Sequence, residues 1–300
     1  MNLDFDLAQV ATTEFGIGRD GDAPPFSFVV VDAGVQNALI EMCLLTWSVM
    51  QDLTDNPPKY EPSEKYASSE YVFVALADDL ATRLRQLHTA NNLPTDNTVL
   101  TDPSTIFCYF VRLTDQQGRR LTALRRAAQF KGVLKTRLVR FASDALRLVE
   151  DRVFKLDVDF DLLVDNQNLH ILRPLAFEFV GDLQEAVLAA VSQNIAALKQ
   201  EMTFLNFDVI ERYAAEHPRA ARYLASIRSQ QNTENIDRLA LKRLCGNTGV
   251  EIRESKGKIV IDEGAVLGFL EVLDRRRYKL ELIKGTAERF KATSRSQLQN

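Results

Sequence analysis

Three aspartates occupy alternate positions in the segment Leu156–Val164, which reads LDVDFDLLV. A strand would put Asp157, Asp159 and Asp161 on one face and the apolar residues on the other. Carboxylates that converge in this way can bind Mg²⁺ and support a metal-dependent nuclease. The Glu-x-Lys element of such nucleases occurs only at residues 254–256, at a predicted hairpin tip. A solvated carboxylate face, or one paired with the preceding basic segment, is therefore the favoured interpretation, and no metal site is predicted.

Positive charge is concentrated in one segment that begins before these aspartates. Residues 111–147 carry 10 basic and 2 acidic residues, residues 1–110 carry 5 and 16, and residues 275–300 carry 8 and 2. Lys and Arg bind phosphates without reading a base sequence, so the first segment is a candidate DNA-binding surface. The predicted DNA-binding residues are Arg119, Arg120, Arg125, Arg126, Lys131, Lys135, Arg137 and Arg140. The alternative is a solvated face, or an interaction scaffold in which this segment meets an acidic partner surface.

A weaker candidate for DNA binding lies further along the chain. Predicted helices over residues 207–216, 219–229 and 234–245, followed by a hairpin over 249–262, have the order of a winged helix-turn-helix. Its basic residues would be Arg238, Lys242 and Arg243 on the third helix and Lys256 and Lys258 on the wing. The same order of elements also arises by chance in α+β proteins.

The remaining motifs do not point to catalysis. Residues 16–21 match G-x-G-x-x-G, but Pro24 and Pro25 follow directly, so a turn is expected rather than a dinucleotide-binding loop. The histidines are scattered, and neither a nucleophile elbow nor a phosphate-binding loop is present. We therefore predict no catalytic residue and no cofactor, and favour a protein that is not an enzyme.

The bulk composition indicates a cytoplasmic globular protein. The chain has 300 residues, of which 46% are hydrophobic and 26% are charged, as in ordinary globular domains. Its three cysteines are widely spaced, which fits a reducing compartment. The most apolar stretch, residues 35–50, is too short and too polar to span a bilayer.

The hydrophobic periodicity predicts an α+β fold. We expect an N-terminal and central mixed sheet with hairpins, followed by a largely helical C-terminal region with one hairpin. Strands are expected at residues 26–31, 71–76, 105–113, from 121 onward, at 156–164, 170–172, 175–180 and 277–283. Helices are expected at 35–53, 80–88, 134–148, 182–198 and 263–273, besides the three named above. The predicted domains are residues 1–180 and 181–300, with a single compact unit as the alternative.

Three segments resemble the family of the Kiwa anti-phage defence subunit KwaB. They are residues 125–131 (RRAAQFK), the strand segment 156–164 with its return as far as FEF at 177–179, and the closing ERFKATS at 288–294. The resemblance extends in order and spacing over roughly residues 100–295. The acidic N-terminal hundred residues offer no motif to compare.

The resemblance implies properties that the residues alone do not. Kiwa proteins act as a pair, in which a cytoplasmic subunit docks on a small membrane-embedded one. The cytoplasmic subunit of that family self-associates, with a dimer expected, binds DNA and limits phage replication. We accordingly expect an antiviral defence protein that binds DNA without strong sequence specificity and is recruited to the inner face of the membrane. The family motif assigns no individual DNA-contacting residue.

Overall fold

The computed structural model describes most of the chain, namely residues 1–21, 25–96, 105–127, 139–142, 145–148, 154–230, 233–283 and 286–292. Its internal contacts divide the chain into two compact units. Unit 1 comprises Met1–Tyr60 and Tyr66–Leu183, and unit 2 comprises Glu61–Lys65 and Gln184–Asn300. Each unit has its own hydrophobic core. Unit 1 contains a sheet and unit 2 is mostly helical, so the predicted α+β class is confirmed.

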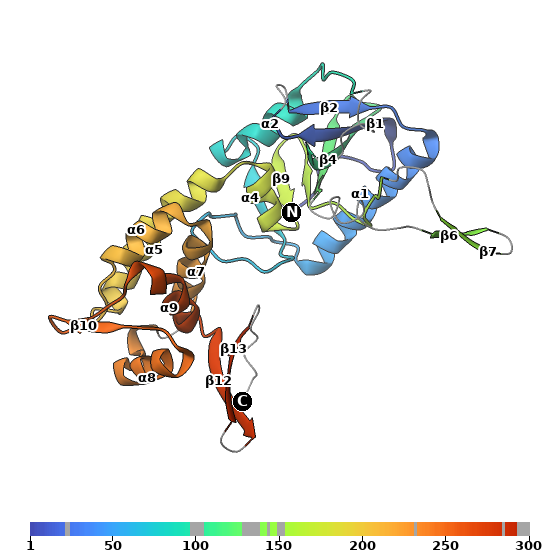
Figure 1. Cartoon of the computed structure of the whole chain (residues 1–300). Coiled ribbons are helices and arrows are strands. Elements are labelled where there is room, and N and C mark those ends of the chain that lie inside the picture. The colour runs from blue at the N-terminus through green and yellow to red at the C-terminus, as the bar shows by residue number, and fades with distance from the viewer. Residues whose placement is uncertain are drawn as a thin grey trace. The chain divides into compact units, whose positions relative to one another are not determined.

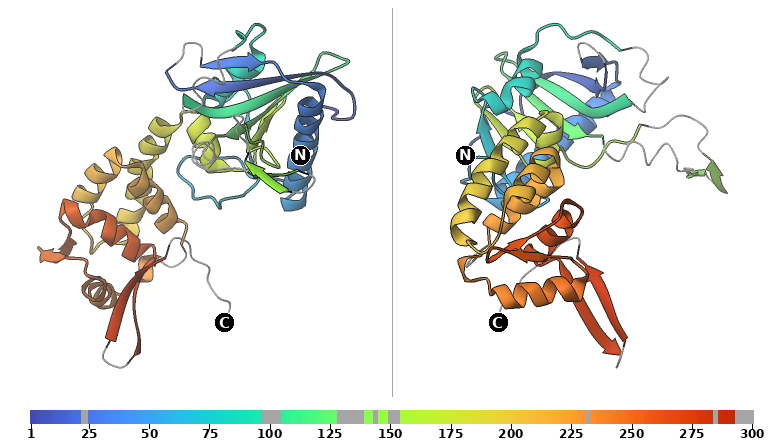
Figure 2. Two further views of the ribbon diagram at one scale, coloured as in Figure 1. Left: turned by 45° about the vertical axis from the view of Figure 1, so that its right-hand side comes forward. Right: turned by 60° about the vertical axis from the view of Figure 1, so that its left-hand side comes forward.

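Unit 1 is built on an antiparallel sheet with the strand order β2-β1-β4-β5-β8-β9-β3 (Figures 1 and 2). The strands are β1 (Val10–Arg19), β2 (Phe26–Val29), β3 (Val72–Ala75), β4 (Ile106–Asp115), β5 (Arg120–Arg126), β8 (Leu162–Val164) and β9 (Asn168–Ile171). The long strands β1 and β4 pair along most of their length, and β5 joins them to the β8–β9 hairpin. The aspartate segment therefore meets the basic segment through β5.

Helices cover both faces of this sheet. Helix α1 (Ala33–Leu53) begins at Asp32, whose carboxylate accepts the Val35 amide at 2.8 Å, and buries its apolar side against β1, β4 and β5. Helices α2 (Thr82–Thr89) and α4 (Pro174–Val180) contact the opposite face of β5. There, His88 of α2 hydrogen-bonds the Thr122 hydroxyl at 2.9 Å.

Unit 2 packs helices around a single core. They are α5 (Gln184–Glu201), α6 (Asp208–Glu216), α7 (Pro218–Arg228), α8 (Arg238–Thr248) and α9 (Val266–Leu273). Two ribbons accompany them, β10 (Arg253–Ser255) with β11 (Lys258–Val260), and β12 (Arg277–Ile283) with β13 (Thr286–Lys291). The predicted turn of the first ribbon is confirmed, because Lys256 and Gly257 have φ of 50° and 78°, as a tight hairpin requires.

The helix predicted over residues 134–148 is wrong in its described part. Residues 139–142 and 145–148 form the paired strands β6 (Val139–Ala142) and β7 (Ala145–Leu148). The apolar residues recur at helical spacing only when the sequence is read across both segments. Within each segment they alternate with Arg140 and with Arg147, which is the period of a strand.

Two further predictions of secondary structure are corrected. Residues 175–180 belong to helix α4 and do not continue a strand, because Pro174 occupies the first turn of the helix, where its missing amide costs nothing. Residues 286–291, for which no element is predicted, form β13 and pair with β12. The strand expected over 156–164 is limited to residues 162–164.

The turn predicted over residues 16–21 is also wrong for most of its length. Residues 10–19 are strand β1, and only Gly21 among the described residues of this stretch has a positive φ, of 86°. Gly16 and Gly18 lie where aromatic rings of β4 cross the strand. A Cβ atom on Gly16 would lie 2.2 Å from Phe110 Cζ, and one on Gly18 would lie 2.7 Å from Phe107 Cζ. These glycines therefore make room for packing.

Candidate functional site

The three aspartates converge on the guanidinium of Arg125 in β5. Arg125 Nε lies 3.0 Å from Asp157 Oδ2. Its Nη1 lies 3.2 Å from Asp159 Oδ1 and 2.7 Å from Asp161 Oδ1. The Arg125 side chain is 13% exposed. The carboxylates are therefore not a solvated face but pair with the basic segment, which was the other favoured interpretation. The structure brings the aspartates and an arginine of that segment together at one place.

A second guanidinium completes this cluster. Arg173, between β9 and α4, lies 2.7 Å from Asp159 Oδ2 and 3.2 Å from Asp161 Oδ1. The remaining oxygen of Asp161 accepts the backbone amide of Arg126 at 2.6 Å. We call Asp157, Asp159, Asp161, Arg125 and Arg173 the aspartate–arginine cluster. Its three carboxylates exceed its two guanidiniums by one charge, and each carboxylate is engaged by donors within the protein.

Burial and pairing oppose each other within the cluster. Burial raises the pKa of the Asp161 carboxyl, and the positive charges of Arg125 and Arg173 limit that rise. For Arg125, burial lowers the pKa, but the negative charges of Asp161 and Asp157 outweigh it and raise the pKa. No group of three or more His, Cys, Asp or Glu side chains that could hold a metal ion occurs among the described residues. The arrangement is that of an ion-pair network which joins β5 to the β8–β9 region.

The other predicted DNA-binding residues of β5 lie at its two ends. Arg119 pairs with Asp115 at 2.7 Å and lies 3.7 Å from Asp4. Arg120 donates to the side-chain oxygen of Asn91 at 3.0 Å. Six residues of strand separate Arg120 from Arg126, which is about 20 Å at roughly 3.3 Å per residue. The structure therefore separates these arginines along the strand.

Arg126 differs from its neighbour Arg125. Its guanidinium carbon lies 4.0 Å from the ring centroid of Phe179 in α4, and its Nε has no hydrogen-bond partner among the described residues. Such stacking holds a guanidinium in a fixed plane without neutralising it. Lys131, Lys135 and Arg137 lie outside the described residues, and Arg140 lies in β6, where only the backbone is described.

The helices and the hairpin expected of a winged helix-turn-helix occur in the predicted order. Helix α8 begins at Arg238, four residues later than expected, and ends at Thr248, followed by the capping residue Gly249, whose φ is 72°. Arg238 and Lys242 lie 2.7 and 3.0 Å from Glu254 of β10, so these two cations hold the helix to the hairpin. Arg243, Lys256 and Lys258 are exposed.

Sequence reasoning missed a hydrogen-bonded chain in the core of unit 1. Asp165 Oδ2 lies 3.0 Å from His170 Nε2, and His170 Nδ1 lies 2.8 Å from the Tyr71 hydroxyl. Burial raises the pKa of Asp165, but the hydrogen bond of His170 and those of backbone amides outweigh it and lower the pKa. Asp165 and His170 are fully buried, so this chain orders the β8–β9 turn and offers no access to a substrate.

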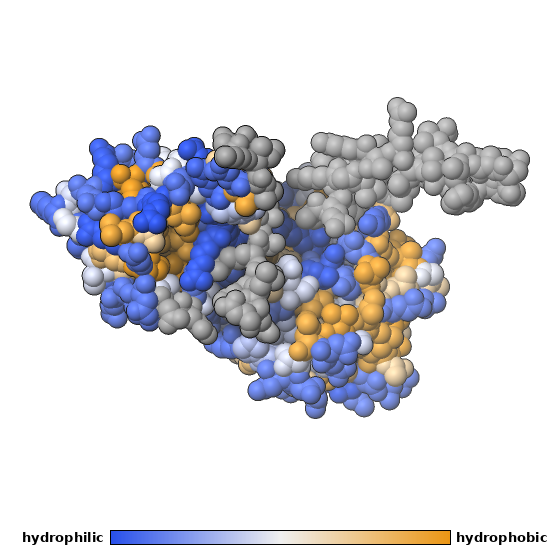
Figure 3. All heavy atoms as spheres, turned by 90° about the horizontal axis from the view of Figure 1, so that it is seen from below, coloured by the Kyte–Doolittle hydropathy of each residue, from blue (hydrophilic) through white to orange (hydrophobic). Residues whose placement is uncertain are grey.

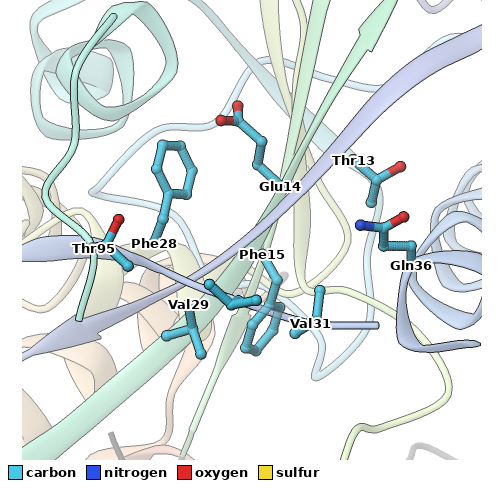
Figure 4. Close-up of a pocket in the computed structure, with 9 residues that line it drawn as sticks. Thr13, Glu14, Phe15, Phe28, Val29, Val31, Gln36 and Thr95 are labelled. Carbon is cyan, nitrogen blue, oxygen red and sulfur yellow. The ribbon is translucent and has the colours of Figure 1, made fainter. Parts of the chain in front are cut away.

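An open hollow of about 260 Å³ lies beside β1 and β2 (Figure 4). Among the described residues that line it, Glu14 is the only ionisable one, and the others are threonines, valines, Phe15, Phe28 and Gln36. This lining contains no nucleophile paired with a base, and none of the predicted site residues. The hollow therefore adds no catalytic arrangement.

The surface mixes hydrophilic and hydrophobic side chains on the face shown in Figure 3. Exposed large hydrophobic residues occur in both units, among them Val30, Val158, Leu239 and Tyr278. Within the described part of the chain, no helix is long and apolar enough to cross a membrane.

Comparison with known proteins identifies one family. The sequence model of the family described as Kiwa protein KwaB-like matches residues 104–282. The match includes β4, β5, the aspartate–arginine cluster, the helices α5 to α9 of unit 2 and most of β12. No curated protein and no solved structure matches the chain.

Proposed function

The chain belongs to the KwaB-like family of Kiwa proteins, which makes it a component of Kiwa anti-phage defence, and from that premise we propose that it binds DNA through the basic segment. The observation that carries this proposal is the concentration of 10 basic and 2 acidic residues in positions 111–147. Such a segment binds phosphates by charge and needs no base contacts, so binding is weakly selective for sequence.

The described arginines of the basic segment differ in their partners, which supports a structural role for one of them and DNA binding for others. Arg125 is committed to three carboxylates, so it stabilises the fold and is not available to a phosphate. Arg126 stacks on the Phe179 ring, and Arg120 donates to neutral oxygens of described residues. The DNA-binding residues are therefore the remaining arginines and lysines of the predicted set, with Arg125 in a structural role.

The proposal includes two protein partners. Family membership supports a membrane-embedded subunit of the same defence system, which recruits this cytoplasmic chain to the inner face of the membrane. It also supports self-association, with a dimer as the simplest assembly.

A salt titration with duplex DNA tests the DNA-binding proposal. The variant is the triple substitution Arg120→Glu, Lys131→Glu and Lys135→Glu, which spares Arg125. We expect weaker binding and a shallower dependence on salt, by roughly 0.9 in the logarithmic slope for each phosphate that the variant no longer neutralises. The matched control is Lys59→Glu, Lys65→Glu and Lys199→Glu, which changes the net charge equally at exposed positions elsewhere.

The same titration separates the alternatives. Equal binding by both triple variants would remove the basic segment from the proposal. Loss of intact DNA only when Mg²⁺ or Mn²⁺ is added would favour the alternative of a metal-dependent nuclease. The absence of DNA retention at low salt would favour a scaffold whose basic segment meets an acidic protein surface.

A further inference from the structure

Unit 2 contains a buried carboxylate surrounded by cations. Glu271 in α9 is fully buried. Its Oε1 accepts from Arg219 at 3.3 Å, from the Tyr223 hydroxyl at 3.3 Å and from Lys291, and its Oε2 accepts from Arg277 at 2.8 Å. The three cations come from α7, β12 and β13, so one carboxylate fixes side chains from three elements. We call Arg219, Arg277, Lys291 and Glu271 the Glu271 cluster.

The Glu271 cluster carries an excess of positive charge, with three cations on one carboxylate. Burial raises the pKa of Glu271, but the hydrogen bonds and charges of Lys291 and Arg277 outweigh it and lower the pKa, so the carboxylate is ionised at neutral pH. The aspartate–arginine cluster of unit 1 instead has an excess of negative charge, with three carboxylates and two guanidiniums. The side chain of Arg219 is 59% exposed, and those of Arg277 and Lys291 are partly exposed, so the excess charge faces solvent.

The ribbon of β12 and β13 presents aromatic rings next to this charge. Arg277 pairs with Lys291 across the ribbon, and the adjacent pair is Tyr278 with Phe290. The Tyr278 and Phe290 rings stack with centroids 5.6 Å apart and planes inclined by 21°, and the residues are 44% and 38% exposed. Figure 1 shows the ribbon extending away from the helices of its unit.

Cross-strand partners share a face, so the ribbon has two different sides. One side carries Arg277 and Lys291, which reach Glu271, and also Lys279 and Arg289. The other side carries Tyr278, Phe290 and the 40% exposed Leu280, whose cross-strand partner is Glu288. The fixed cations and the exposed aromatic rings therefore lie on opposite sides of a narrow two-stranded ribbon, one register step apart.

We propose that this ribbon binds single-stranded nucleic acid along its edge, with phosphates at the Glu271 cluster on one side and a base stacked on the Tyr278–Phe290 pair on the other. This inference rests on the proposed function for its class of ligand, nucleic acid. It adds a binding site separate from the basic segment and specifies that the bound nucleic acid is single-stranded. Single-strand binding combines a positively charged track with aromatic side chains on which bases stack.

The observations favour this ligand over two others. In a duplex the base faces are already stacked on one another, so the aromatic pair would have no role. A second copy of the ribbon would bring its own excess of cations against this one, because the described residues of 275–292 include six basic and two acidic side chains. A single strand has phosphates that the cations can bind and unstacked bases that can stack on the aromatic rings.

The test compares fluorescence anisotropy of the full chain with a labelled oligothymidylate and with duplex DNA of mixed sequence. The first variant is Tyr278→Leu with Phe290→Leu, which keeps an apolar ribbon surface, and its control is Leu280→Ala on the same side. The second variant is Arg219→Gln, and its control is Arg253→Gln, an arginine of unit 2 on the β10–β11 ribbon. Circular dichroism of each variant checks that the fold is retained.

The aromatic variant is expected to bind the single strand about tenfold more weakly while duplex binding is unchanged, since stacking one base contributes roughly 1–3 kcal/mol. Arg219→Gln is expected to lower the salt slope for the single strand by roughly 0.7, the contribution of one phosphate contact. Both controls are expected to bind like the unsubstituted protein.

Four results would overturn the inference. If the unsubstituted protein binds both ligands and neither variant changes single-strand binding, the site is wrong while the proposed function stands. If inorganic phosphate competes as well as the oligonucleotide, the cluster is a small-anion site. If the aromatic variant changes only the mass measured by light scattering, the ribbon joins two copies. If neither nucleic acid is bound at low salt, the proposed function fails as well.

Discussion

At the scale of single residues, neighbours in sequence have different roles. Arg125 and Arg126 are adjacent and chemically identical, yet the first is enclosed by three carboxylates and the second lies against an aromatic ring. Alternation along β5 sends their side chains to opposite faces of the sheet. A basic segment identified from sequence therefore contains both cations that are paired inside the fold and cations that can bind a ligand. Counting charges along the sequence does not distinguish the two kinds.

Arg125→Gln is expected to lower the free energy of unfolding by about 3 kcal/mol, because removing one partner leaves buried carboxylates uncompensated. The loss should be greatest at neutral pH. Burial already raises the pKa of Asp161, and removal of Arg125 raises it further. A carboxyl whose folded pKa lies above its unfolded value destabilises the fold once it ionises, so the deficit should shrink as the pH falls. Urea denaturation at several pH values measures this.

The matched control is Arg119→Gln. Arg119 is 35% exposed and pairs with Asp115, whose carboxylate also accepts the backbone amides of Gln117 and Arg119, so removing this guanidinium leaves the carboxylate hydrogen-bonded and should destabilise the fold less than Arg125→Gln. A similar loss of stability in both variants, or a deficit for Arg125→Gln that grows in acid, would contradict a structural role for the aspartate–arginine cluster.

At the scale of elements, close packing decided several assignments that local propensity did not. Glycines usually indicate a turn, but Gly16 and Gly18 lie inside β1 because rings of β4 occupy the space that a side chain would need. The helix predicted over 134–148 and the strand over 175–180 failed because each sequence fits both periods over a short stretch. The pairing of β6 with β7 selects the strands in the first case, and Pro174 at the first position of α4 selects the helix in the second.

Gly16→Ala is expected to lower the free energy of unfolding by roughly 1–3 kcal/mol, since a Cβ atom would meet both Phe110 and the Ser27 carbonyl oxygen, at 2.2 and 2.6 Å. The control is Gly246→Ala in α8, where no described atom lies within 4 Å. There, alanine should be neutral or stabilising by up to about 1 kcal/mol. Thermal unfolding of both variants gives the comparison, and a decrease at Gly246 equal to that at Gly16 would refute the packing argument.

At the scale of the whole molecule, the two compact units are not continuous in sequence. Residues Glu61–Lys65 belong to unit 2 although the chain on either side belongs to unit 1. Asn194 of α5 holds this short segment, donating to the Ser63 carbonyl at 3.2 Å and accepting from Arg228 at 2.9 Å. Arg228 also lies 3.5 Å from Glu64. Unit 2 therefore includes a short segment that precedes its main part by more than a hundred residues in sequence.

Asn194→Ala is expected to speed amide hydrogen exchange over residues 61–65, because the segment loses its buried hydrogen bond to α5. Exchange in the β-sheet of unit 1 should be unchanged. Gln193→Ala, exposed on the same helix, is the control. Unchanged exchange at 61–65 in the Asn194 variant would show that other interactions hold the segment.

The sequence by itself determined the α+β class, most helices and strands, the turn of the β10–β11 ribbon and the family. These properties depend on local periodicity, on turn residues and on short motifs, all of which can be read from the amino-acid sequence without knowing the fold. The resemblance read from residues 125–131 and 156–179 agrees with the matched family. The prediction of DNA-binding residues rests on charge in sequence, and it remains a proposal.

Only the tertiary structure decided which charges are available. Asp157, Asp159 and Asp161 pair with Arg125 because β8 joins the sheet beside β5, and Glu271 gathers cations from α7, β12 and β13 because α9 packs among them. The energy of an ionised group depends on burial and on partners that are tens of residues away. Sequence records that these charges exist, whereas packing determines which of them neutralise one another and which still face solvent.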